Sequence, residues 1–164
     1  MHRDHTGWGD ERYVNQSGRN DIVAAKAAYD AKNVSFYVRT RQAITPASDK
    51  SWMLLYLNVG GTYRKGWLGY DFVVNRHPGS RDTSLEADVG GTYSWKPVSS
   101  VGYRVARNEL MIVIPRKLLG LSNGENVIDF KWADSVAQTG DPSDFTLNGD
   151  SAPDDRFNYR ARFP

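Results

Sequence analysis

Apolar and polar residues alternate with a period of two along several short runs of the chain. In the run VSFYVRT, residues 34–40, every second residue from Val34 to Val38 is apolar. The pattern recurs in SWMLLYLNV at 51–59, with Leu54 as an exception, in KGWLGYDFVVNR at 65–76 and in NVIDFKWAD at 126–134. Because a strand sends successive side chains to opposite faces, each run predicts a strand with one apolar and one polar face.

Turn signals separate these runs, and no long stretch shows helical periodicity. Gly-Gly at 60–61 and 90–91, HPGS at 77–80, Asn-Gly at 123–124 and TGDP at 139–142 are typical of turns. The run ELMIVI at 109–114 is apolar in both registers and predicts a central strand covered on both faces, and PRKLLG after it predicts one helical turn. Many short strands joined by turns predict an all-β fold, an antiparallel β-sandwich of the jelly-roll type.

The length of 164 residues suits a single domain. We expect an irregular, polar lead-in at 1–19, then one sandwich domain at 20–164 that ends in an edge strand within RFNYRAR, residues 156–162. The first residues, MHRDHTGWGDERY, contain no apolar stretch of the kind found in a signal peptide. If the protein is secreted, its signal lies upstream in a longer parent protein.

Composition narrows the classes of function. The net charge of +2 comes without any Lys/Arg run, so nucleic acid is not an expected partner. No run approaches the roughly 18 apolar residues of a membrane span. There are no cysteines, which excludes disulfides and thiolate chemistry. None of the three histidines belongs to a recognisable nucleophile motif, so no catalytic residue is predicted.

The polar registers of the predicted strands contain aromatic rings beside carboxylates, amides and cations. Rings cover the C–H faces of sugars, and the polar groups satisfy sugar hydroxyls, so these residues predict a shared carbohydrate-binding face. The candidates are Trp67, Trp52, Tyr56, Tyr37, Arg39, Asp71, Asn75 and Lys131, with Trp95 from the loop GGTYSWKPVSS. Two alternatives remain open: an ordinary solvent-facing surface, and packing beneath a loop. Asp71 is also a candidate structural partner of Arg39 or Lys131.

An acidic segment near the end of the chain is the candidate metal site. Six aspartates lie between residues 134 and 155, and carboxylate oxygens are the ligands that Ca²⁺ prefers. We therefore name Asp134, Asp150 and Asp154 as candidate ligands of a structural calcium ion. The alternative is a solvated acidic loop with turn-forming aspartates. No organic cofactor is predicted.

Several motifs resemble one known family when they are taken in order. GWLGYDFVVNR, SLEAD, IPRKLLG, DFKWADS and GDSAPDDRFNYR together resemble the family 9 carbohydrate-binding modules and the wider DOMON-like group. The resemblance implies a jelly-roll sandwich that binds sugar without catalysis, often with bound Ca²⁺. Family 9 modules clamp a terminal sugar between two Trp rings. Trp52 lies near the first position, whereas DSAPDDRF has no Trp for the second, so the clamp does not carry over as a pair.

The predicted function is therefore a non-catalytic carbohydrate-binding module, fused to a polysaccharide-degrading enzyme and acting outside the cell, at its surface or in the periplasm. Its partner would be a polysaccharide or oligosaccharide. Arg39, Arg104 and Lys131 make an acidic glycan worth testing. The main alternative is a structural or protein-docking spacer domain. A haem-binding redox domain and a stand-alone enzyme are further alternatives, although Met53, Met111 and His77 show no evident pairing as haem ligands.

Overall fold

The computed structural model describes residues 18–62, 69–91, 94–121, 124–136, 144, 148–154 and 157–164. Short antiparallel strands and one 3-10 turn form the regular structure of these residues. In chain order they are β1 (Ile22–Tyr29), β2 (Asn33–Thr40), β3 (Leu54–Val59), β4 (Phe72–Pro78), β5 (Asp82–Asp88), β6 (Trp95–Ala106), β7 (Glu109–Pro115), η1 (Arg116–Leu119), β8 (Asn126–Asp134), β9 (Asp150–Ala152) and β10 (Tyr159–Phe163). The predicted all-β class, the helical turn and the final edge strand are confirmed.

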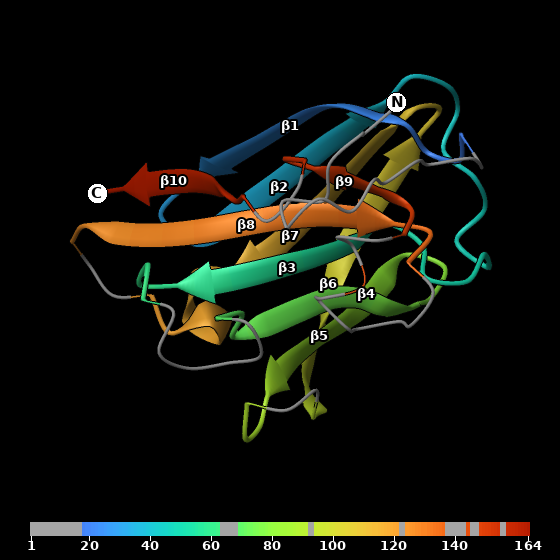
Figure 1. The fold of residues 1–164 in the computed structure, drawn as a ribbon. Coiled ribbons are helices and arrows are strands. Elements are labelled where there is room, and N and C mark those ends of the chain that lie inside the picture. Colours follow the sequence, from blue (N-terminus) through green and yellow to red (C-terminus); the bar gives the residue numbers. More distant parts are fainter. Residues whose placement is uncertain are drawn as a thin grey trace, which may run out of the picture.

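All the strands belong to one sheet with the order β1-β2-β7-β6-β5-β4-β3-β8-β10, and β9 pairs with β8 beside β10. Each neighbouring pair is antiparallel. Along this path the direction reverses at each step, so the two end strands, β1 and β10, run the same way, as their arrowheads show in Figure 1.

The sheet curls until it is nearly closed into a barrel. The end strands lie side by side (Figure 1), and the rings of Tyr29 and Phe163 meet across the gap with their centroids 4.8 Å apart. The strand pairing does not join β1 to β10, so the contact between these two strands is made by side chains. Near the start of β1, the backbone N–H of Ile22 donates to the Asp150 carboxylate at 2.6 Å and links β1 to β9.

The enclosed face of the sheet holds the main hydrophobic core. Phe36 of β2 and Phe130 of β8 pack edge to face across it, with ring centroids 5.3 Å apart. Ile112 of β7 and Leu57 of β3 are fully buried in the same cluster. Trp132, which the sequence also places in the core, has no exposed surface there. The period-two runs thus provide the inner face as expected.

A second, smaller core covers the opposite face of β3, β4 and β8. Its buried members are Leu54, Tyr56, Tyr70, Val73, Trp95, Ala133 and Val136. Tyr56 belongs to this second core and Trp52 to the main core, so the prediction that both belong to a shared open face was wrong. The prediction for ELMIVI was also wrong: β7 alternates, with Glu109 and Met111 exposed on its outer side. β7 is central in the sheet, but β3 and β8 are the strands that are buried on both faces.

Candidate functional site

Five of the predicted sugar-binding residues are buried and do not form a shared open face. Trp52, Tyr56, Asn75, Lys131 and Trp95 are between 0 and 9% exposed. The predicted common surface was wrong for these residues: Tyr56 and Trp95 lie in the second core, Trp52 lies in the main core, and Asn75 and Lys131 are buried polar residues. They hold structure together in the geometry described below, and Trp52 alone also lines a surface groove.

Two of the buried polar side chains among them, Asn75 and Lys131, donate hydrogen bonds to backbone carbonyl groups. The Asn75 amide donates to the carbonyl oxygens of Trp52 and Met53, at 3.1 and 3.0 Å. The ammonium group of Lys131 donates to the carbonyl oxygen of Pro153 at 2.6 Å. Asn75 therefore ties β4 to the segment before β3, and Lys131 ties β8 to the turn after β9.

The remaining candidates lie in different environments. Asp71 accepts a hydrogen bond from the Val59 N–H at 2.7 Å and so joins β3 to the start of β4. Tyr37 and Arg39 lie on the outer face of β2, where the Tyr37 hydroxyl donates to Glu109 at 2.7 Å. This hydrogen bond raises the pKa of Tyr37 above its ordinary value, because it stabilises the protonated hydroxyl. Trp67 lies outside the described residues.

The candidate calcium ligands are occupied in part by donors of the protein. Asp134 is fully buried and accepts hydrogen bonds from Arg19, Asn20 and the Met53 N–H. Asp150 accepts from the Ile22 N–H. Over the residues that the structure describes, no group of three or more His, Asp or Glu side chains could hold a metal ion. Calcium binding stays a prediction.

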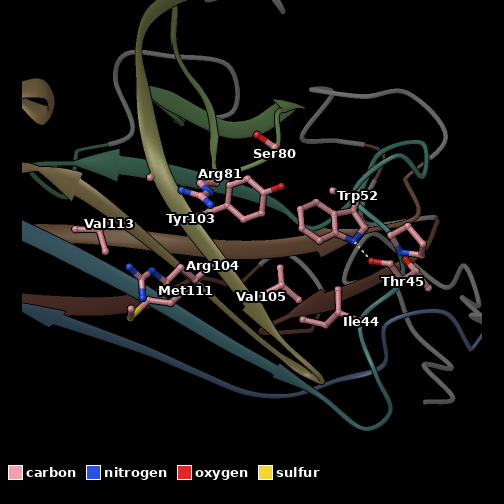
Figure 2. Close-up of a pocket in the computed structure, with 13 residues that line it drawn as sticks. Ile44, Thr45, Trp52, Ser80, Arg81, Tyr103, Arg104, Val105, Met111 and Val113 are labelled. Atoms are coloured by element: carbon pink, nitrogen blue, oxygen red, sulfur yellow. Dashed lines mark hydrogen bonds between the residues drawn. The ribbon is translucent and has the colours of Figure 1, made fainter.

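A surface groove of about 990 Å³ opens at the end of β6 (Figure 2). It arises because the register of β5 with β6 ends at the pair Asp82–Gly102, while β6 continues to Ala106. The free edge of β6 is left between the turn before β5 and the segment 44–47. The lining residues are Ile44, Thr45, Pro46, Ala47, Trp52, Ser80, Arg81, Gly102, Tyr103, Arg104, Val105, Met111 and Val113.

An aromatic pair stands on one side of the groove. Tyr103 and Trp52 pack edge to face with centroids 5.8 Å apart, and Figure 2 shows the two rings beside each other above Val105. Both rings are fixed by hydrogen bonds. The Trp52 indole N–H donates to the Thr45 carbonyl at 2.8 Å, and the Tyr103 hydroxyl donates to the Gly79 carbonyl at 2.6 Å. Burial, followed by the charge of Asp82, raises the pKa of Tyr103.

Backbone groups of β6 also face the groove. The Tyr103 N–H donates to the Arg81 carbonyl at 3.1 Å, which shows that the peptide groups of this residue point away from β7. Peptide groups two residues apart in an antiparallel strand point to the same side, so the N–H and C=O of Val105 face the groove. Val105 is 41% exposed and lines the groove.

Two arginines border the groove, Arg81 on the side of the aromatic pair and Arg104 on the opposite face of β6. Figure 2 shows Arg81 beside the Tyr103 ring and Arg104 beside Met111. Within the described chain, neither guanidinium group has a hydrogen bond or an ion pair. Other arginines are paired with carboxylates, namely Arg19 with Asp134, Arg41 with Asp21, Arg76 with Glu86, Arg160 with Asp129 and Arg162 with Glu125. Arg81 and Arg104 therefore keep their donors for a ligand.

Tyr103 and Arg81 were missed as candidates in the sequence. One signal was available: Gly102 interrupts a strand pattern in VGYRVA, and a glycine inside a strand often marks a close approach by a ligand or a second backbone. A Cβ built on Gly102 meets no atom within 4 Å, so the position opens onto free space. Arg104 did stand in a polar register of the sequence, and the structure places it at the groove.

Comparisons of the chain with protein-family models, with curated proteins and with solved structures found no match. The resemblance to the family 9 modules therefore stays a prediction. Among the described residues, no helix is long and apolar enough to cross a membrane.

Proposed function

We propose that this chain is a non-catalytic carbohydrate-binding module with a jelly-roll-like sandwich fold, and that it binds a glycan in the groove at the free edge of β6. The observation that carries the proposal is the combination of Tyr103, Val105 and Arg81 around one cavity. The ring supplies a stacking surface, and the peptide and guanidinium groups supply hydrogen bonds to hydroxyls.

The dimensions and rigidity of the groove support this assignment. Its volume of about 990 Å³ is at the upper end of the range typical of small-molecule sites, and suits a sugar with part of its neighbours. Because Trp52 and Tyr103 are already hydrogen-bonded to the backbone, little side-chain entropy is lost when a ligand binds. Fused to a polysaccharide-degrading enzyme outside the cell, such a module would raise the local concentration of substrate.

The test is a polysaccharide-binding screen with wild type and the variant Gly102→Leu. A Cβ at this position meets no atom within 4 Å and the backbone is not left-handed there, so we expect a leucine side chain to occupy space at the lining of the groove. We expect Gly102→Leu to keep its thermal stability and to lose glycan binding. Ser100→Leu is the matched control: it adds a leucine at an exposed position two residues earlier on β6, outside the groove lining, and should bind like wild type.

The same screen with and without a chelator tests the calcium prediction. Loss of binding in chelator would indicate a calcium-dependent site, whereas unchanged binding would favour the solvated acidic loop. If no glycan is bound under either condition, the proposal is wrong and the spacer domain is favoured. If glycan is bound equally well by Gly102→Leu, the binding site lies elsewhere on the module.

A further inference from the structure

A row of four cross-strand neighbours leads away from the groove over the outer face of the sheet. Lys26 of β1 is opposite Tyr37 of β2, Tyr37 is opposite Met111 of β7, and Met111 is opposite Arg104 of β6. Residues directly opposite each other share a face of the sheet. Arg104 and Met111 also line the groove, so the row and the groove form one continuous surface.

The row offers a second contact surface for a chain-like ligand. Met111 is 39% exposed. The Tyr37 ring is held by the hydrogen bond to Glu109 and by the Lys26 ammonium, which lies 5.7 Å from the ring centroid. Four neighbouring strands span roughly 14 Å, from three gaps of about 4.8 Å each. That length accommodates a few sugar units beyond the groove.

Positive charge dominates this surface. Lys26, Arg39, Arg81 and Arg104 lie on it or at its border, against the carboxylates of Glu109 and Asp82. Glu109 accepts the Tyr37 hydroxyl, and Asp82 accepts the Ser100 hydroxyl at 2.8 Å. The guanidinium group of Arg39, like those of Arg81 and Arg104, has no hydrogen bond or ion pair within the described residues. A planar guanidinium group without a carboxylate partner in the protein can bind a carboxylate or sulfate group of a ligand through two parallel hydrogen bonds.

We infer that the ligand of the groove is an acidic glycan, and that an internal stretch of its chain extends from Arg81 and Arg104 over Met111 to Tyr37. The inference rests on the proposed function and adds the charge of the ligand and the direction of its chain. The acidic group is a carboxylate or a sulfate. Polygalacturonate and dextran sulfate, with neutral cellulose and dextran beside them, distinguish these sources of negative charge.

The first experiment measures binding of these polymers by the wild-type protein, Arg81→Gln, Arg104→Gln and Lys96→Gln. Each arginine variant should bind an acidic glycan about tenfold more weakly. That change in affinity corresponds to the loss of one charge-assisted hydrogen bond. Lys96→Gln is the control, because it removes one exposed cation from the same strand outside the groove. Binding should also weaken as salt rises, since salt screens exposed charges.

The second experiment tests the direction of the chain with oligogalacturonates of two and six units. Tyr37→Leu should weaken binding of the hexamer several-fold and leave the dimer unchanged, because only the longer ligand reaches β2. Gly102→Leu should abolish binding of both. An equal loss for both lengths in Tyr37→Leu would contradict the assignment of Tyr37 to the far end of the chain, and so would no loss for either length.

The outcomes separate this inference from the proposed function. Neutral glycans bound as tightly as acidic ones, with sensitivity to Gly102→Leu, would overturn the inference and leave the proposed function standing. A single-stranded DNA oligomer bound as tightly as the glycan of equal charge would also overturn it, because charge alone would then explain binding. Absence of binding to every glycan would overturn both.

Discussion

At the scale of single residues, Asp134 connects three parts of the chain. Its carboxylate accepts hydrogen bonds from the Arg19 guanidinium at 2.8 Å, from the Asn20 amide at 3.0 Å and from the Met53 N–H at 2.9 Å. The Asp134 side chain has no exposed surface, whereas that of Arg19 is 21% exposed. The Asp134 carboxylate, at the end of β8, therefore joins that strand to the segment that leads into β1 and to the segment before β3.

Replacement of this carboxylate should destabilise the fold strongly. In Asp134→Ala the buried donors of Asn20 and Met53 lose their acceptor, and the free energy of unfolding should fall by about 3 kcal/mol. The control is Glu125→Ala, which breaks an exposed pair with Arg162 and should cost less than about 0.5 kcal/mol. Urea denaturation followed by Trp fluorescence measures both. Equal stability of the two variants would contradict a structural role for Asp134.

Tyr103 predicts a response to high pH. Its pKa is raised above 10 by burial and by Asp82, so the unfolded chain releases this proton first. The contribution of Tyr103 to stability is therefore fully present below about pH 10 and is lost as the pH rises through the folded pKa. Tyr103→Phe should flatten the fall in stability above pH 10. A tyrosine absorbance titration should also lack one late-titrating group in this variant, and an unchanged titration would contradict the raised pKa.

At the scale of elements, β4 shows what the sequence could and could not predict. Alternation and turn signals place a strand in this region, and a strand is present at Phe72–Pro78. The pairing with β5 shifts its register between Val74 and Pro78, and Asn75 has a φ of 77°. Between these pairs β4 advances by four residues and β5 by two, so β4 contains two extra residues in a bulge, where side chains depart from regular alternation. Alternation alone therefore could not show that Asn75 points into the protein instead of towards a ligand.

Burial of both faces of β3 had a different cause. Tyr56 and Leu54 read as a polar or mixed register in the sequence, but Tyr70 and Val136, remote along the chain, pack with them in the second core. The alternation of apolar and polar residues within one strand does not show which residues from distant parts of the chain will pack on its outer face. The same limit explains why Tyr37 was placed correctly on an outer face and Trp52 was not. Tyr37 contacts Lys26 and Glu109 on the neighbouring strands, whereas Trp52 packs against Tyr103.

Asn75 gives the prediction at this scale. Its amide holds two carbonyl groups, and its left-handed backbone is unfavourable for residues other than Gly, Asn and Asp. Asn75→Gly should lower the free energy of unfolding by about 2 kcal/mol through loss of the hydrogen bonds. Asn75→Ala should cost about 1 kcal/mol more, because alanine also strains the backbone. Thermal or urea unfolding of both variants checks the order, and a more stable alanine variant would contradict the left-handed conformation.

At the scale of the whole molecule, the strand order places the groove. β6 extends beyond the pairing with β5, which ends at Asp82 and Gly102. Tyr103, Val105 and Arg81 line the groove at the edge of β6 that is left there. The order in which β7 lies between β2 and β6 also brings Tyr37 and Met111 into one row with Arg104. This pairing of strands remote in sequence is what joins the proposed binding residues into one surface.

The same strand order leaves two ends that do not pair. Among the residues that the structure describes, β1 pairs only with β2 and β10 pairs only with β8, whereas β7 pairs with both β2 and β6. The backbone N–H and C=O groups on the facing edges of β1 and β10 are therefore not paired with each other. The rings of Tyr29 and Phe163 are in contact across the gap between the two strands. Local opening of a protein begins where such pairing is weakest. The two end strands should therefore open before the centre of the sheet.

Hydrogen exchange measured by mass spectrometry checks this order. Peptides from 22–29 and 159–163 should exchange well before the peptide from 109–115, because part of their amides lack a strand partner. Tyr29→Ala should accelerate exchange in β10 and leave β7 unchanged, since the ring contact is the link that it removes. Leu110, buried in β7, offers the converse control, because Leu110→Ala should accelerate exchange throughout the sheet. Protection of β10 equal to that of β7 would mean that the two end strands are hydrogen-bonded in solution and that the barrel is closed.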